Sequence, residues 1–273
     1  MAAFQGLRFG FAEGTQFLST STIKETMLYP SSGNTYIHTC ICLHPLFMMK
    51  QLVIYIELCL WVFREGVKGS IDGSNELIQP GTNFTYKIEL KGEIGTLWWH
   101  ATSAWAAATV HGAFVISPAA NEDYPFPAPT SDQTIILGQW FKQELTEGDK
   151  TIAPGRADAY TINGHPGETY GCSNDTTFEM QVDYEGLYLV RVINAVVNET
   201  MVFAVASHSF TIVGQNGAYT KRSFTNSLTL APAQVVDVLL CANVNVGHYY
   251  ITARPSSGTY ITNGILRYLT TSS

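Results

Sequence analysis

A repeating pattern of short apolar stretches and turn signals begins at about residue 77 and constrains the fold more than any other feature of the chain. The stretch Phe84–Leu90 alternates apolar and polar residues directly after the turn signal at 79–81, as a half-buried strand does. Many short strands at this spacing predict an all-β sandwich. Further strands are expected at Leu97–Trp99, Ala113–Ile116, Thr134–Leu137, Leu187–Ile193, Val202–Ala206, Phe210–Val213, Leu228–Leu230, Val235–Leu240 and Tyr249–Ala253.

Length and composition favour two globular units. A chain of 273 residues is long enough for two ordinary domains, because single cores stop growing at about 250–300 residues. Hydrophobic residues make up 46% and charged residues 14%, which argues against disorder. The stretch 117–132 is rich in proline and lacks an apolar period, so it predicts an interdomain linker. We expect an irregular segment over 1–75, the remainder of a first domain with the linker over 76–130, and a second domain over 131–273.

The first 75 residues lack the regular strand and turn pattern, so this segment is the least consistent with a well-packed domain. Its most apolar run, Leu52–Phe63, is shorter than the about 20 residues that a membrane helix needs, and it contains Glu57. We therefore expect a buried segment and no membrane association. The amino terminus shows no basic region followed by an apolar run, so no signal peptide is visible.

The net charge of the chain bears on its partners, and its glycosylation signals bear on its compartment. The net charge of −7 provides no basic surface for phosphates, so we expect no nucleic-acid partner. Three N-x-S/T sequons, at Asn83, Asn174 and Asn198, predict glycosylation and therefore passage through the secretory pathway. Five cysteines are an odd number, so at least one thiol is unpaired or pairs outside the chain.

Two histidines and two cysteines stand at every second position of the segment from residue 38 to residue 44. On a strand all four side chains, His38, Cys40, Cys42 and His44, share one face, and zinc takes four such ligands. A straight strand, however, spaces same-face residues by about 6–7 Å, so four in a row do not close easily around one ion. We favour a chance run over a zinc site.

The aromatic segment Gly95–Gly112 contains the strongest candidate for chemistry, His100. By itself, a histidine in such a strand is most often a core residue with one hydrogen-bonded imidazole. This segment, however, resembles the plant laccase motif W-W-H-A-H-x-x-W-x-R-A-T-V-x-G. The matching residues are Trp98, Trp99, His100, Ala101, Trp105, Ala108, Thr109, Val110 and Gly112.

The resemblance to plant laccases continues in the expected order along most of the remaining chain. Similar stretches lie at 78–86, 134–140, 159–167, 170–173, 189–195, 207–214 and 231–238. Plant laccases are multicopper oxidases, so the resemblance implies two cupredoxin-like Greek-key β-sandwich domains, the first of them incomplete.

The resemblance also implies copper binding at His100, because in the family both histidines of W-W-H-A-H bind a trinuclear copper cluster. Thr102 takes the place of the second histidine, and its hydroxyl is a poor copper ligand because it does not ionise at neutral pH. The family's H-W-H-G motif is absent; residues 33–39 resemble the strand leading into it, so His38 is not expected to be a ligand. We expect His100 to be the one metal ligand.

The remaining histidines and the cysteines do not complete such a site. No cysteine has a histidine directly on each side, so the thiolate of a blue-copper site is missing, and the family's third domain, which carries that thiolate, is not in this sequence. We expect that copper is not bound stoichiometrically. His111, His165, His208 and His248 match family positions that do not bind copper, although His111 could support a ligand.

The resemblance assigns Cys172 to a family cysteine that pairs with one in the first domain. The corresponding stretch at 75–81 contains no cysteine. We therefore expect this interdomain disulfide to be missing, and the loss of such a bond typically costs about 2–5 kcal/mol.

The resemblance implies the function of a laccase, which is the oxidation of phenols or lignin precursors coupled to reduction of dioxygen, in the cell wall or apoplast. We expect this chain to be inactive by itself, because most of the copper ligands are absent. The alternative is a non-catalytic cupredoxin-like binding or structural module, or the product of a gene remnant. A partner that covers the face normally contacted by the third domain is a further expectation.

Overall fold

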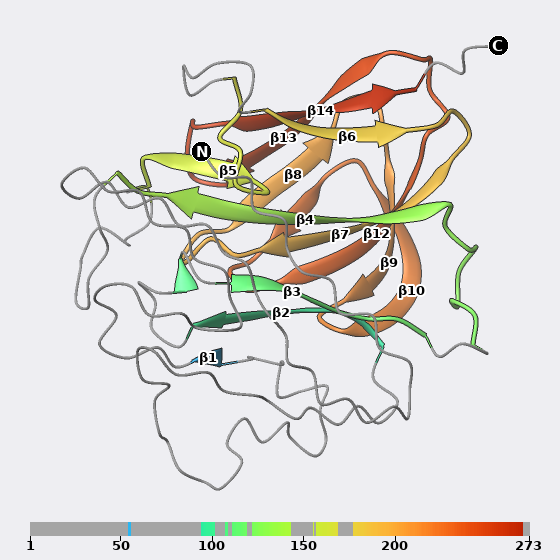
Figure 1. Cartoon of the computed structure of the whole chain (residues 1–273), viewed down its shortest axis with the longest axis horizontal. Helices are drawn as coiled ribbons and strands as arrows, with labels where there is room; N and C mark the ends of the chain where they lie inside the picture. Colours follow the sequence, from blue (N-terminus) through green and yellow to red (C-terminus); the bar gives the residue numbers. More distant parts are fainter. Residues whose placement is uncertain are drawn as a thin grey trace, which may run out of the picture.

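A computed structural model describes residues 94–101, 107–108, 111–118, 122–142, 155, 157–168 and 177–269, together with the backbone of 54–55. These residues form strands in three sheets, and Figure 1 shows the strands as arrows. Residues 38–44 and Phe84–Leu90 lie outside the described residues. No described helix is long and apolar enough to cross a membrane.

Two open sheets pack face to face and form a β-sandwich. One sheet has the order β10-β9-β12-β7-β4-β5 and the other β11-β8-β13-β14-β6. Neighbours pair antiparallel except β4 with β7 and β14 with β6, which are parallel. The six-stranded sheet contains β4 (Ser131–Trp140), β5 (Ala159–Ile162), β7 (Leu187–Asn194), β9 (Phe210–Gln215), β10 (Ala218–Thr225) and β12 (Val235–Cys241). The five-stranded sheet contains β6 (Phe178–Val182), β8 (Met201–Val205), β11 (Leu228–Leu230), β13 (His248–Pro255) and β14 (Thr262–Tyr268).

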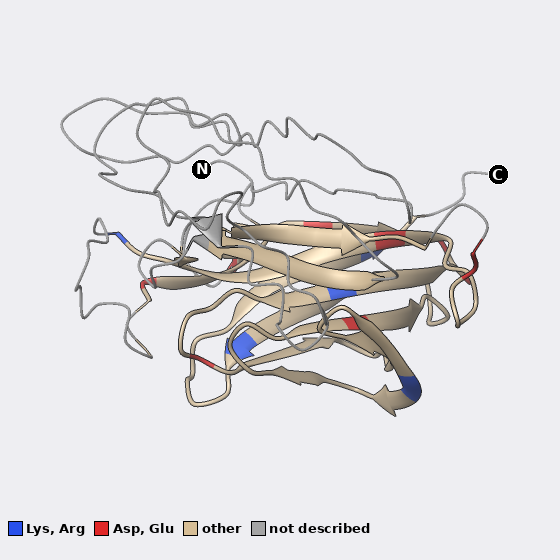
Figure 2. Ribbon diagram, turned by 90° about the horizontal axis from the view of Figure 1, so that it is seen from below, with Lys and Arg blue, Asp and Glu red and all other residues tan. Residues whose placement is uncertain are grey.

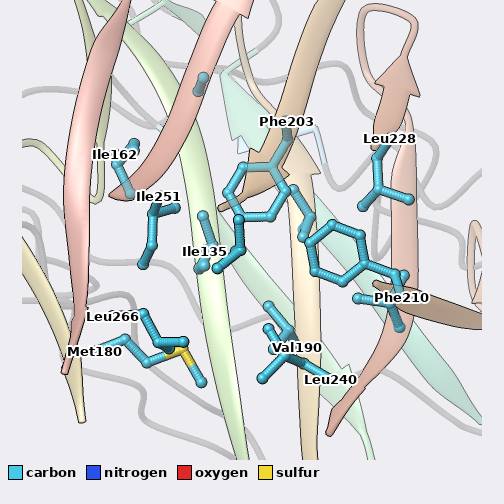
Figure 3. Packing of buried hydrophobic residues seen from close by; sticks show 14 of the residues in the cluster. Ile135, Ile162, Met180, Val190, Phe203, Phe210, Leu228, Leu240, Ile251 and Leu266 are labelled. Atoms are coloured by element: carbon cyan, nitrogen blue, oxygen red, sulfur yellow. The ribbon is translucent and has the colours of Figure 1, made fainter. Parts of the chain in front are cut away.

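The sandwich core comes from alternate residues of both sheets. Along β7, Tyr188, Val190 and Val192 point into the space between the sheets, where they belong to one buried cluster. Phe203 of the five-stranded sheet and Phe210 of the six-stranded sheet stack across this space with ring centroids 5.9 Å apart (Figure 3). The alternation follows from the strand period of two, because successive side chains point to opposite faces of the strand, and one of these faces is turned toward the other sheet.

A small third sheet covers the outer face of the six-stranded sheet. It consists of the hairpin β2 (Gly95–Ala101) and β3 (His111–Ile116), with β1 (Ile54–Tyr55) paired to the far side of β2 (Figure 1). Trp98 of the hairpin packs on Ile136, Ile193 and Val235 of the sandwich. The part of this outer face that β4, β7 and β12 form is therefore covered, not solvated.

The segment between the hairpin and the sandwich packs against the same sheet. Phe126 is buried with Leu189 and Leu239, and its ring meets Tyr219 edge to face at 5.1 Å. The predicted linker thus contains a buried aromatic residue, Phe126, that attaches it to the sheet. The proline content of the stretch did not indicate this contact.

One glycine permits close contact between hairpin and sandwich. Asn216 and Gly217 form the β9–β10 turn with φ values of 46° and 78°, as a type I′ turn requires. A Cβ on Gly217 would lie 2.6 Å from Leu97 Cδ2 of β2, so any larger residue would push the hairpin away.

The expected all-β fold class is confirmed, and the nine strands expected between Leu97 and Ala253 are all present within a few residues. Four strands of the sandwich, β5, β6, β10 and β14, were not expected. Most side chains of the edge strand β10 are exposed, so β10 lacks the apolar alternation on which the prediction depended. Charged residues are few along the described ribbon (Figure 2), and Lys221 and Arg222 are adjacent on β10.

Candidate functional site

His100 lies near the end of β2 on the face that packs against the sandwich. Its half-buried ring stacks on Trp98, two residues earlier on the same face, with centroids 4.4 Å apart and planes inclined by 33°. Trp98 itself is clamped by the aliphatic residues Ile136 and Ile193. The sandwich therefore fixes the position of the Trp98 ring, on which the His100 ring lies.

His111 is the direct cross-strand neighbour of His100. Its Nδ1 lies 2.8 Å from the carbonyl oxygen of Ala107, and because a carbonyl only accepts, we assign the ring hydrogen to Nδ1. The Nε2 atom points toward β4, where it is 4.0 Å from the position that a Cβ on Gly138 would take. Burial lowers the pKa of His111 to about 4, against the opposing effect of the Ala107 bond, so the ring is neutral at pH 7.

The described donors do not fit the copper cluster implied by the laccase motif. Within 94–101, 107–108, 111–118 and the described sandwich residues, no three His, Cys, Asp or Glu side chains are grouped closely enough to hold a metal ion. His100 and His111 are adjacent imidazoles, but a trinuclear cluster needs many more donors than two. Thr102 lies outside the described residues.

The other described histidines have structural positions. His208 is buried, with Nδ1 2.7 Å from the Ala206 carbonyl oxygen and Nε2 2.8 Å from the Tyr268 hydroxyl, so it belongs to a core hydrogen-bond network. His165 forms a β-bridge with Ile162, and His248 is exposed at the start of β13. None of these three rings lies with His100 in a donor group among the described residues.

Several other predicted residues can be placed only in part. Asn198 is exposed in the turn between β7 and β8, with φ of 64°, a conformation that asparagine adopts more readily than most residues. Cys241 is an exposed free thiol at the end of β12. Outside the described residues lie His38, Cys40, Cys42, His44, Asn83, Cys172 and Asn174.

A buried ionic cluster that was not expected from the sequence lies beneath β2. The Arg191 side chain is fully buried on β7; its Nη1 donates to Thr96 Oγ1 at 2.7 Å, and its Nε donates to Asp132 Oδ2 at 3.2 Å. Asp237 Oδ2 on β12 lies 3.7 Å from Nη1. A signal for this cluster exists in the sequence, because Arg191 and Asp237 are single charges inside otherwise apolar strands.

Burial of this cluster changes its acid–base behaviour. Desolvation raises the pKa of Asp237 above its ordinary value, although the Arg191 guanidinium and hydrogen bonds from Thr96 act in the opposite direction. Gly214 gives Asp237 its space, because a Cβ there would lie 3.1 Å from Asp237 Oδ2.

Comparison with known proteins identifies the family. Two sequence profiles, both described as multicopper oxidase, match residues 63–121 and 131–271, and the second alone covers just over half of the chain. The chain belongs to the multicopper oxidase family. The expected resemblance to plant laccases is confirmed as well: this multicopper oxidase is 44% identical to Laccase-14 of Arabidopsis thaliana over 189 residues and 42% identical to Laccase-25 of Oryza sativa subsp. japonica over 185 residues.

The match covers most of this chain but a minor part of its relatives. The two alignments cover 67% and 65% of the chain, and 33% and 32% of the relatives. This multicopper oxidase therefore spans about a third of the length of the laccases that it matches.

Solved structures support the cupredoxin-like fold of the multicopper oxidases. Fet3p, a multicopper oxidase that functions in iron import, superposes with a TM-score of 0.66 at 17% identity, covering 83% of this chain and 44% of Fet3p. A laccase from Botrytis aclada superposes with a TM-score of 0.62 at 22% identity, covering 82% and 44%. At these identities the likeness concerns the fold alone.

Proposed function

We propose that this chain is a laccase-type multicopper oxidase polypeptide that does not by itself sustain the laccase reaction, the oxidation of phenols or lignin precursors coupled to reduction of dioxygen. The similarity to plant laccases supports the reaction class and the phenolic substrates. The replacement of the second histidine of the W-W-H-A-H motif by Thr102 carries the proposal of inactivity, because it leaves His100 as the one matching ligand.

The geometry around His100 supports a weak and incomplete copper site. A single imidazole holds copper(II) poorly, since metal sites gain affinity from several ligands that the protein fixes in advance. His111 is neutral and adjacent, but its Nδ1 is engaged by the Ala107 carbonyl and its Nε2 is directed toward β4. We propose that His111 supports the position of His100 rather than binding copper.

A second candidate function is a non-catalytic cupredoxin-like module, including one encoded by a gene remnant. The packing of the sandwich favours it: a large core cluster of buried residues connects both sheets although the described donor set is poor. Such a core stabilises a folded binding or structural module without any metal.

Copper loading with oxygen-uptake measurements tests the proposal. The purified chain is loaded with copper, and uptake on a dimethoxyphenol is recorded together with the visible thiolate-to-copper band. We expect neither signal. A blue sample that consumes oxygen on the phenol would contradict the proposal and exclude the non-catalytic module.

Two variants then test the residues. Thr102→His restores the second histidine of the motif and adds a ligand, so we expect copper(II) affinity to rise by about tenfold, which corresponds to about 1.4 kcal/mol. His100→Gln should remove the residual binding, whereas His248→Gln, a matched change at an exposed histidine, should leave it unchanged.

We propose secretion to the cell wall or apoplast as the location of the protein. The three sequons and the exposure of Asn198 support this proposal. Fusion of the full coding sequence to a fluorescent protein in plant cells tests it, and a signal confined to the cytosol would contradict it.

A further inference from the structure

The outer face of β7 carries a charge between two apolar positions. Ile193, Arg191 and Leu189 follow one another on this face, because alternate residues of a strand point the same way. Ile193 packs under Trp98 of the hairpin, and Leu189 packs under Phe126 of the preceding segment. Arg191 therefore lies between the two apolar contacts that attach the first part of the chain to the sandwich.

The guanidinium of Arg191 joins four strands at this point. It is fixed within the six-stranded sheet by Asp237 on one neighbouring strand and Asp132 on the other. The remaining strong contact, 2.7 Å to Thr96 Oγ1, crosses to the hairpin. Thr96 is fully buried, so this hydrogen bond is shielded from water.

Thr96 lies on the same face of β2 as Trp98 and His100. A strand advances about 6.6 Å for every two residues, so a shift of β2 along its axis would displace all three side chains together. The His100 ring is the last of the three and stacks on Trp98. A shift of Thr96 relative to Arg191 would therefore move His100 by a similar amount.

We propose that Arg191 is a positioning residue for His100: through its hydrogen bond to Thr96 it fixes how the hairpin lies on the sandwich, and so where the imidazole is presented. This inference rests on the proposed role of His100 as a copper ligand. It adds that a residue of the sandwich, distant from His100 in sequence, sets the geometry of that ligand.

The apolar contacts by themselves would fix the hairpin less well. Hydrophobic attraction has no preferred direction, so Trp98 could slide over the aliphatic residues beneath it at small cost. A charge-assisted hydrogen bond from a planar guanidinium depends on both distance and angle. In some proteins, buried polar groups that fix register in this way add specificity even where they add little stability.

The variants that test the proposal change the hydrogen bond with as little change in volume as possible. Thr96→Val removes the hydroxyl, and Thr96→Ser keeps it. The double variant Arg191→Met with Asp237→Leu removes the guanidinium together with its buried partner Asp237, and leaves the carboxylate of Asp132, whose side chain is 30% exposed. Arg267→Met is the matched control, because Arg267 makes an ion pair with Glu179 on the other sheet.

The readout is the NMR shift of the His100 ring in the metal-free protein, recorded at one pH for all variants. The ring currents of Trp98 shift this signal, which is assigned by its loss in His100→Gln. We expect Thr96→Val and the double variant to move it toward the value in the urea-unfolded chain. Thr96→Ser and Arg267→Met should keep the native value.

An unchanged His100 shift in folded Thr96→Val and in the folded double variant would overturn the proposal, as would an equal shift in Arg267→Met. Circular dichroism follows folding in each sample. If Thr96→Val unfolds where the native chain is folded, the contact serves stability and not position, and the proposal also fails. Because no copper is present, this outcome is independent of whether His100 binds the metal.

Discussion

His100 and His111 face each other across two paired strands but differ in their surroundings. His100 lies half-buried against an indole ring, whereas Nδ1 of His111 is bonded to a backbone carbonyl and its Nε2 is directed at the sandwich. The laccase motif identified the first residue, since it is part of a short continuous pattern. The partners of the second became visible only in the structure.

The neutral state of His111 predicts a loss of stability in acid. Its pKa falls from the ordinary 6.5 to about 4 in the folded protein, so the unfolded chain takes up the proton first. Stability from this group is complete above about pH 6.5 and is lost progressively between pH 6.5 and 4. Urea denaturation of the metal-free protein should show about 2 kcal/mol less stability from this group at pH 5 than at pH 7.

The matched variant His111→Gln separates this effect from the titration of carboxylates. Its stability should fall less between pH 7 and pH 5 than that of the native chain, by about the same 2 kcal/mol. Equal losses in the two proteins would show that His111 is not held neutral by its site.

Asn198 is the sequon that can be judged from the structure, and we expect it to carry a glycan. Its side chain is exposed in a turn, so the glycosylation enzyme can reach it. Glycopeptide mass spectrometry of the chain secreted from plant cells should show the modification, and Thr200→Ala should remove it. An unmodified Asn198 peptide in the secreted native chain would contradict the assignment, while Asn83 and Asn174 stay predictions.

The ionic cluster illustrates the limit of prediction for single residues. Arg191 and Asp237 could have been noticed as charges within apolar strands, and such charges are paired when they are buried. Their partners could not have been deduced, because Asp132 and Thr96 lie 59 and 95 residues from Arg191 in the sequence.

Among the strands, those with long apolar runs were predictable, whereas β6 was not expected although its residues alternate between buried and exposed. β7 and β12 are central strands with long apolar runs, and both were expected within one or two residues of their actual ends. The edge strand β10 and the four-residue β5 lacked such a signal. Their formation depends on pairing with a neighbour that the local sequence does not reveal.

The strand β8 provides a test of the core. Phe203 is fully buried and stacks on Phe210, so Phe203→Ala should lower the free energy of unfolding by about 3–5 kcal/mol through lost contacts and a cavity. Phe224 on β10 is 82% exposed, so Phe224→Ala should change that free energy by less than about 0.5 kcal/mol. Chemical denaturation measures both, and similar losses in the two variants would contradict the assignment of the core.

At the scale of the whole molecule, the sequence predicted an all-β protein of cupredoxin-like type, and the fold class is confirmed. It did not predict that the hairpin and the following segment would lie flat on the outer face of one sheet. That arrangement depends on Trp98, Phe126 and Arg191 acting together, and these residues are far apart in the sequence. The division into segments 1–75, 76–130 and 131–273 stays a prediction.

The number of copper ions that the purified chain retains tests most directly whether it provides a complete oxidase site. The protein is loaded with copper, desalted and measured by elemental mass spectrometry, with electron paramagnetic resonance to identify the type of site. With His100 as the one matching ligand, we predict less than one tightly bound copper per chain and the spectrum of a weak, isolated ion. Three or more copper ions per chain, with the coupled signature of a trinuclear cluster, would contradict that prediction.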